Sequence, residues 1–143
     1  MRRAVCGAIG LCGMAVLAWQ APVRADDAYE RPYQVVDGKV DQTTYNGFRR
    51  YHASCHVCHG PDGLGSSYAP NLLDSLKVMD RDAFNDVVIN GRENLAAGQE
   101  KVMPAFGEVE DVALYLDDIY AYLKARSDGV LPRGRPQRMA ASG

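Results

Sequence analysis

A nine-residue stretch, HASCHVCHG, constrains this chain of 143 residues more than any other segment. It runs from His52 to Gly60 and holds all three His of the chain and two of its four Cys. Cys55, Cys58 and His59 have the spacing C-x-x-C-H. Thiols and imidazoles bind metals, form redox disulfides or anchor a cofactor, so three kinds of site compete for this spacing.

Two of these sites lack what they require. A zinc site needs about four protein ligands, and the sequence has no Cys after Cys58 and no His after His59. A thioredoxin-like C-x-x-C is expected in a βαβ unit, whereas the segment before Cys55 predicts a helix. The spacing instead matches covalent haem attachment, in which both thiols bond to haem vinyl groups and the next His binds iron. We predict one haem c through Cys55 and Cys58, with His59 on iron and His52 and His56 as bystanders.

The opposite face of such a haem usually takes a Met or a second His. No His remains downstream, and beyond the first 25 residues the Met are Met79, Met103 and Met139. Pro104 directly follows Met103 and keeps this segment out of a helix, which favours Met103 as the ligand. Met79 precedes a predicted helix and suits a core position, and Met139 lies in a polar tail. Either of them, or an open sixth position, stays possible on this reasoning.

The N-terminus has the pattern of an export signal. Arg2 and Arg3 precede an uncharged apolar run, Ala4–Ala18, which is shorter than the ~20 residues that span a bilayer. Small residues follow at positions 23 and 25. We predict a signal peptide over 1–25, a periplasmic mature form without a membrane span, and a change in formal net charge from −2 to −5, because three Arg leave with the signal.

Three helices are expected in the remainder of the chain. The first runs from about 44 to 58, and the second follows Asp80, a good N-cap, and ends at Gly91. The third covers about 110–129, where apolar residues recur at helical spacing. Residues 26–41 read as an extended N-terminal arm, and residues 127–143, rich in Gly, Pro and Arg, as a flexible tail.

Residues 41–126 resemble the class I c-type cytochromes. The resemblance rests on the haem motif and on five further segments, which surround it in the family's order: Gly47…Tyr51, Ala69–Leu72, Asn90–Arg92, Met103–Phe106 and Ile119–Lys124. It implies an all-α, small cytochrome c fold over residues 42–126, with three main helices wrapped around one covalently attached haem. It also implies that the Pro70 carbonyl accepts a hydrogen bond from the His59 ring, that Arg92 and Met103 belong to the haem site, and that Tyr122 packs on Gly47.

Longer stretches, YQVVDGKVDQTTYNGFRRY before the motif and YLDDIYAYLKARSDGVLPRGRP near the end, resemble the methanol-metabolism-related cytochromes c. That group implies a monomeric one-electron carrier and not an enzyme. Its donor would be a quinoprotein methanol or alcohol dehydrogenase, its acceptor a downstream cytochrome c or terminal oxidase, and nucleic acid would play no part. Two alternatives stay open: a haem-bearing subunit of a dehydrogenase or oxidase complex, and a haem sensor or enzyme with a labile sixth site.

Overall fold

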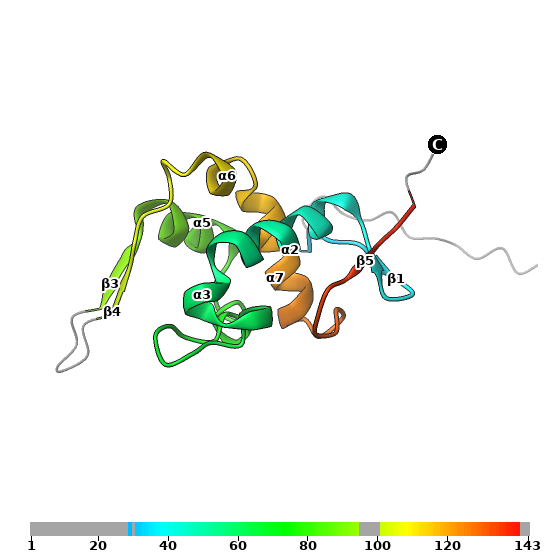
Figure 1. Ribbon diagram of the computed structural model, residues 1–143, viewed down its shortest axis with the longest axis horizontal. Helices are drawn as coiled ribbons and strands as arrows, with labels where there is room; N and C mark the ends of the chain where they lie inside the picture. The colour runs from blue at the N-terminus through cyan, green and yellow to red at the C-terminus, as the bar shows by residue number, and fades with distance from the viewer. Residues whose placement is uncertain (1–28, 30, 95–100, 141–143) are drawn as a thin grey trace, which may run out of the picture.

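The computed structural model describes residues 29, 31–94 and 101–140 (Figure 1). The predicted signal peptide, 1–25, lies outside these residues. The described helices are α2 (Gln42–Ser54), α3 (His56–His59), the 3₁₀ turn η1 (Pro61–Gly63), α4 (Leu72–Ser75), α5 (Arg81–Asn90), α6 (Glu110–Ala113) and α7 (Leu116–Ser127). The strands are β1 (Val35–Val36), β2 (Lys39–Val40), β3 (Arg92–Asn94), β4 (Lys101–Met103) and β5 (Gln137–Arg138).

The crossing of α2 and α7 forms the centre of the molecule. Tyr51 on α2 and Tyr122 on α7 are fully buried, with ring centroids 5.6 Å apart. A Cβ placed on Gly47 would lie 1.8 Å from the Asp118 carbonyl oxygen and 2.9 Å from the Tyr122 Cβ, so only glycine permits this approach. The predicted packing of Tyr122 on Gly47 is confirmed.

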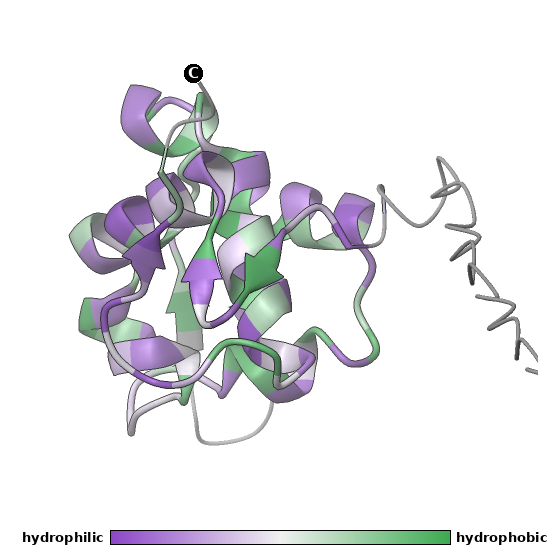
Figure 2. Ribbon diagram, turned by 90° about the vertical axis from the view of Figure 1, so that its right-hand side faces the viewer, coloured by the Kyte–Doolittle hydropathy of each residue, from purple (hydrophilic) through white to green (hydrophobic). Residues whose placement is uncertain are grey.

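Helices show hydrophilic and hydrophobic sides in Figure 2, as expected for elements that each cover part of one core. The second helix agrees with its prediction, because α5 begins after Asp80, whose side chain accepts a hydrogen bond from the Ala83 amide, and ends at Gly91. Within the described residues, no helix is long and apolar enough to cross a membrane.

The other two predicted helices are each divided. α2 ends at Ser54 and α3 begins at His56, so the haem motif occupies a helical turn of its own. The third helix breaks between α6 and α7, where the Tyr115 amide bonds to the Val112 carbonyl in a tighter turn. At this break the Arg50 guanidinium lies over the Tyr115 ring, 4.2 Å from the ring centroid.

The all-α prediction is incomplete, because two small sheets accompany the helices. In the sheet ordered β1-β2-β5, the hairpin between β1 and β2 turns at Asp37 and Gly38, which both have positive φ. An Asp-Gly pair is the preferred sequence for such a turn. The second sheet pairs β3 with β4 and sets Arg92 opposite Met103.

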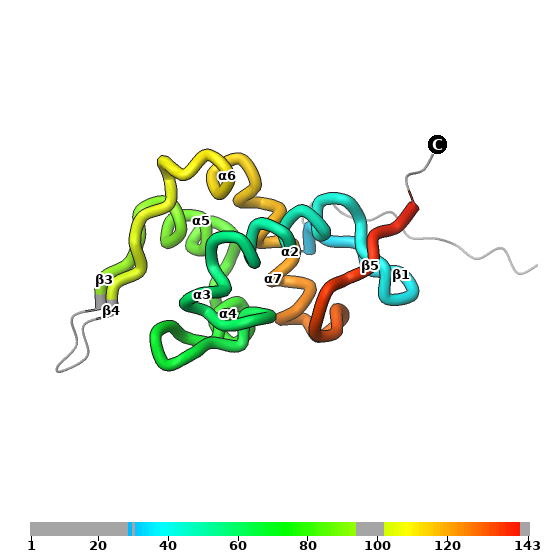
Figure 3. The backbone as a smooth tube through the Cα atoms, viewed as in Figure 1, coloured from blue at the N-terminus to red at the C-terminus, as the bar shows by residue number. Residues whose placement is uncertain are grey.

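The tail 127–143 is expected to be flexible, but the structure packs its described part, up to residue 140, against the body (Figure 3). Leu131 is 2% exposed and belongs to the core cluster, and β5 adds to β2 as a parallel strand. The Met139 amide donates to the Val40 carbonyl at 2.8 Å. We call residues 131–139 the strap, because they run from the end of α7 back to the N-terminal hairpin.

Candidate functional site

The break between α2 and α3 presents the predicted cofactor anchors. Cys55 caps the end of α2, and the amides of Cys58 and His59 both donate to its carbonyl, at 3.2 and 3.0 Å. Cys55 is half-buried and Cys58 is exposed, and the two form no disulfide with each other. Before haem attachment, burial and next the neighbouring Cys58 raise the pKa of the Cys55 thiol to about 11.

The His59 ring is held in one orientation. Its side chain is buried, and Nδ1 lies 3.1 Å from the Pro70 carbonyl oxygen, as the family resemblance implied. A carbonyl only accepts hydrogen bonds, so Nδ1 carries the proton and Nε2 keeps a free lone pair. This arrangement, a backbone carbonyl behind the ring, is the usual support of a metal-binding His.

The loop after His59 is tightly closed around the motif. The buried Tyr51 hydroxyl donates to the Gly60 carbonyl at 2.5 Å, and the Gly65 amide donates to the His59 carbonyl at 2.7 Å. A Cβ on Gly60 would lie 2.4 Å from the Gly65 carbonyl oxygen, so the backbone at the two ends of this loop is in direct contact. The glycines of this segment serve this close turn.

Asp62 is a part of this loop that the sequence reasoning did not single out. Its side chain is 7% exposed, and its backbone has a φ of 63°. The carboxylate accepts hydrogen bonds from the Gly134 amide at 2.9 Å and the Arg133 guanidinium at 3.2 Å. Burial raises the pKa of Asp62, but these bonds and the nearby Arg126 and Arg133 charges outweigh it and lower that pKa below 3.8. The pair "DG" in the sequence marks a turn, although it does not reveal the strap as its partner.

Met103 and Arg92 lie together on the β3–β4 hairpin. Met103 is half-buried and packs against the core cluster, while Arg92 opposite it is exposed. A Cβ on Gly91 would lie 2.7 Å from the Met103 carbonyl oxygen, so glycine allows the two strands to meet closely. The Phe106 amide then donates to the Val88 carbonyl at 2.9 Å and ties the segment to α5. Met79 also packs against the core, in the position expected of a core Met.

His52 and His56 stack on each other along α2 and α3, with ring centroids 5.7 Å apart. Nδ1 of His52 lies 2.9 Å from the Phe48 carbonyl, a local contact within the helix. Nδ1 of His56 is buried and has no hydrogen-bond partner among the described residues. Nowhere in the described ranges do three or more His, Cys, Asp or Glu gather as a metal-binding group.

These residues fit haem c. Two thiols lie one helical turn apart, a buried imidazole is fixed through its Nδ1 by a backbone carbonyl, and a half-buried thioether lies on a separate hairpin. Thiol, imidazole and thioether are the donor types that a c-type haem takes from a protein.

Comparison with known proteins agrees with this donor set. Residues 42–123 match the family model described as cytochrome c oxidase, cbb3-type, subunit III. Cytochrome c-553I of Paracoccus denitrificans is 51% identical over 102 residues, which are 71% of this chain and 45% of that protein. Cytochrome c-555 of Methylococcus capsulatus is 45% identical over 100 residues, 69% of this chain and 75% of that protein. The chain therefore spans less than half of the first relative and three quarters of the second.

A solved structure is similar over most of the fold. The c-type cytochrome XoxG from Methylobacterium extorquens AM1 is 46% identical, with a TM-score of 0.70 over 77% of this chain and 67% of that one. Fold, motif and sequence thus agree, and the chain belongs to the class I c-type cytochromes, with one haem c bound covalently through Cys55 and Cys58.

Proposed function

We propose that this protein is a periplasmic monohaem electron carrier, and not an enzyme. It accepts electrons from a PQQ-dependent methanol or alcohol dehydrogenase and passes them to a downstream cytochrome or oxidase. The main support for a role in electron transfer is the His59 imidazole, which the Pro70 carbonyl fixes beside the two thiols that anchor haem. The resemblance of the segments around the motif to the methanol-metabolism-related cytochromes c supports the choice of donor.

In this proposal His59 and Met103 would supply the two protein ligands of the haem iron. When bound, the haem supplies a one-electron couple between ferric and ferrous iron. The Nδ1–H group of His59 donates a hydrogen bond to the Pro70 carbonyl, which makes Nε2 a stronger ligand. Met103 would supply a thioether, which raises the reduction potential relative to a second His. Arg92, which pairs with Met103 across the hairpin, is proposed to contact the haem.

The signal peptide predicted over residues 1–25 supports a periplasmic location. A carrier of this kind docks through a small, transient interface, and opposite charges steer the approach. Stopped-flow mixing of the ferric protein with purified, substrate-reduced candidate dehydrogenases tests the proposal. We expect fast reduction by the quinoprotein methanol dehydrogenase and a rate that falls as salt rises. Reduction no faster than with an unrelated dehydrogenase would refute the proposed donor.

A second candidate is a haem-bearing subunit of a dehydrogenase or oxidase complex. The match of residues 42–123 to a family described as an oxidase subunit favours it. Co-purification of the native protein with a partner at high salt distinguishes the two, because a mobile carrier dissociates when surface charges are screened.

A further inference from the structure

Two Arg of the strap carry charges that no carboxylate neutralises in the described part of the chain. The Arg135 guanidinium donates to the Tyr45 hydroxyl at 2.6 Å, and the Arg138 guanidinium donates to the Gln42 side-chain oxygen at 2.7 Å. Both acceptors are neutral. Arg133, on the same segment, instead pairs with the Asp62 carboxylate. The strap therefore holds two positive charges in place without compensating them.

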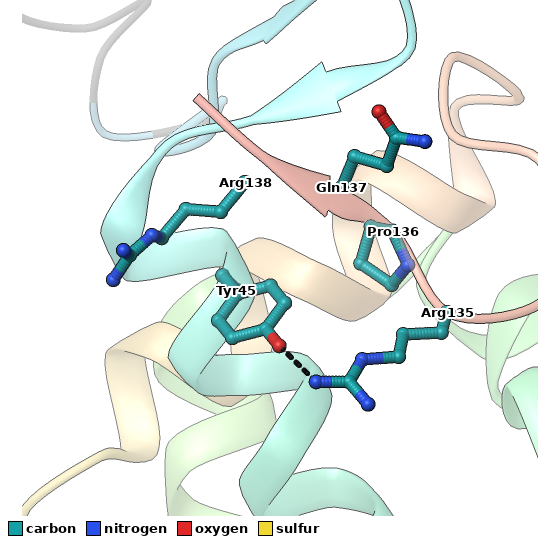
Figure 4. Close-up of a pocket in the computed structure, with 5 residues that line it drawn as sticks. All are labelled: Tyr45, Arg135, Pro136, Gln137 and Arg138. Atoms are coloured by element: carbon teal, nitrogen blue, oxygen red, sulfur yellow. Dashed lines mark hydrogen bonds between the residues drawn. The ribbon is translucent and has the colours of Figure 1, made fainter. Parts of the chain in front are cut away.

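These side chains line an open hollow on the surface, together with Tyr45, Pro136 and Gln137 (Figure 4). The Arg135 guanidinium also lies 5.9 Å from the centroid of the Tyr45 ring. The backbone below is fixed, because β5 pairs with β2 and Pro136 is buried. Side chains that are already positioned lose little conformational entropy when they bind a ligand.

The hollow lies away from the haem-anchoring turn. Tyr45 stands near the start of α2 and Cys55 directly after its end, so ten residues of helix, ~15 Å at 1.5 Å per residue, separate them. In Figures 1 and 3, β5 lies beside the start of α2, and α3 lies at the other end. A ligand in the hollow would leave the haem end of the molecule free.

We propose that this hollow is a docking site for an acidic segment of a partner protein, separate from the surface through which electrons pass. Guanidinium groups recognise carboxylates through paired hydrogen bonds, and two of them suit a run of acidic side chains. The hollow is open, which suits a segment on a protein surface better than an enclosed small anion. In the first turns of α6 and α7, Asp111 and Asp117 pair with Arg50 and Arg81, whereas Arg135 and Arg138 contact only neutral acceptors among the described residues. The strap therefore offers positive charge that an acidic segment can pair with.

Titration of the full-length ferrous holoprotein with a hexaglutamate peptide, followed by amide NMR shifts, tests this docking site independently of the electron donor. We expect the shifts to centre on Tyr45 and Gln137, and Arg135→Gln/Arg138→Gln to raise the dissociation constant at least tenfold. The matched control, Arg49→Gln/Lys77→Gln, removes two exposed charges elsewhere and should change it less than twofold. If the double variant loses its native spectrum, the single variants Arg135→Gln and Arg138→Gln are tested instead. Each should raise the dissociation constant at least threefold.

Three outcomes would overturn the docking site. Shifts centred outside the hollow would show that the peptide binds elsewhere. An equal loss of affinity for hexaglutamate in the control variant would show that only the net charge of the protein matters. Inorganic phosphate that binds the hollow as tightly as hexaglutamate would show a small-anion site, without a protein partner.

Discussion

The Gly134 amide donates a 2.9 Å hydrogen bond to the Asp62 carboxylate, and this contact joins the C-terminal strap to the loop that follows His59. The two residues are 72 positions apart in the sequence. Asp62 is buried and in the left-handed region, where Asn and Asp are the best tolerated residues after Gly. Its carboxylate is therefore the group through which this loop holds Arg133 and Gly134 of the strap.

Asp62→Asn should lower the free energy of unfolding by about 1–3 kcal/mol, because the charged hydrogen bonds to Arg133 and Gly134 are weakened while the backbone is preserved. Urea unfolding of the holoprotein at pH 7 measures this loss. The control is Arg133→Gln, which removes an exposed partner whose side chain is 69% accessible and should cost less than about 1 kcal/mol. Equal losses in both variants would contradict the central role of Asp62.

The same carboxylate predicts an acid dependence. Since the folded pKa of Asp62 lies below its ordinary value of 3.8, the folded state binds fewer protons than the unfolded state in that range. Its contribution to stability is complete above pH 3.8 and is lost as the pH falls through the folded pKa. The difference in unfolding free energy between wild type and Asp62→Asn should therefore shrink from pH 7 to pH 2. A difference that stays constant over this range would rule out the ionised carboxylate as the cause.

Gly47→Val should destabilise the crossing of α2 and α7. The new side chain would collide with the Asp118 carbonyl and the Tyr122 Cβ, and overpacking of this kind costs about 1–3 kcal/mol or more. Thermal unfolding followed by circular dichroism measures the change. Ala53→Val is the matched control, since Ala53 is exposed on the same helix. A melting temperature of Gly47→Val no lower than that of the control would remove this packing argument.

Contacts encoded within a few residues of each other could be predicted from the sequence. The C-x-x-C-H spacing specified the cofactor anchors, Asp80 and Gly91 marked the ends of α5, and the family resemblance anticipated the bond between His59 and Pro70. The strap could not be predicted, because its Gly, Pro and Arg resemble those of a solvated tail. Its order comes from partners far away in the sequence, such as Gln42 for Arg138, 96 positions apart. The turn at Asp37 and Gly38, by contrast, has a recognisable local signal that the extended-arm prediction overlooked.

Cys58→Ser should leave the haem poorly attached, because the hydroxyl cannot form the second thioether. Haem staining after denaturing electrophoresis, normalised to protein, measures covalent attachment. Val57→Ala is the control, since Val57 occupies a variable position of the motif and is 72% exposed. Normal haem content in Cys58→Ser would contradict attachment through this residue.

Met103→Ala should abolish the charge-transfer band between Met sulfur and ferric iron and lower the reduction potential, because a thioether ligand favours ferrous iron. The absorption spectrum of the ferric protein and a redox titration measure the two effects. Met79→Ala is the control, since Met79 also packs half-buried against the core and its loss should leave the band in place. A band that survives in Met103→Ala but disappears in Met79→Ala would move the sixth ligand to the loop before α5. If the wild type lacks the band, the sixth position of the iron is open or holds another ligand. Binding of carbon monoxide by the ferrous protein at neutral pH would identify an open position.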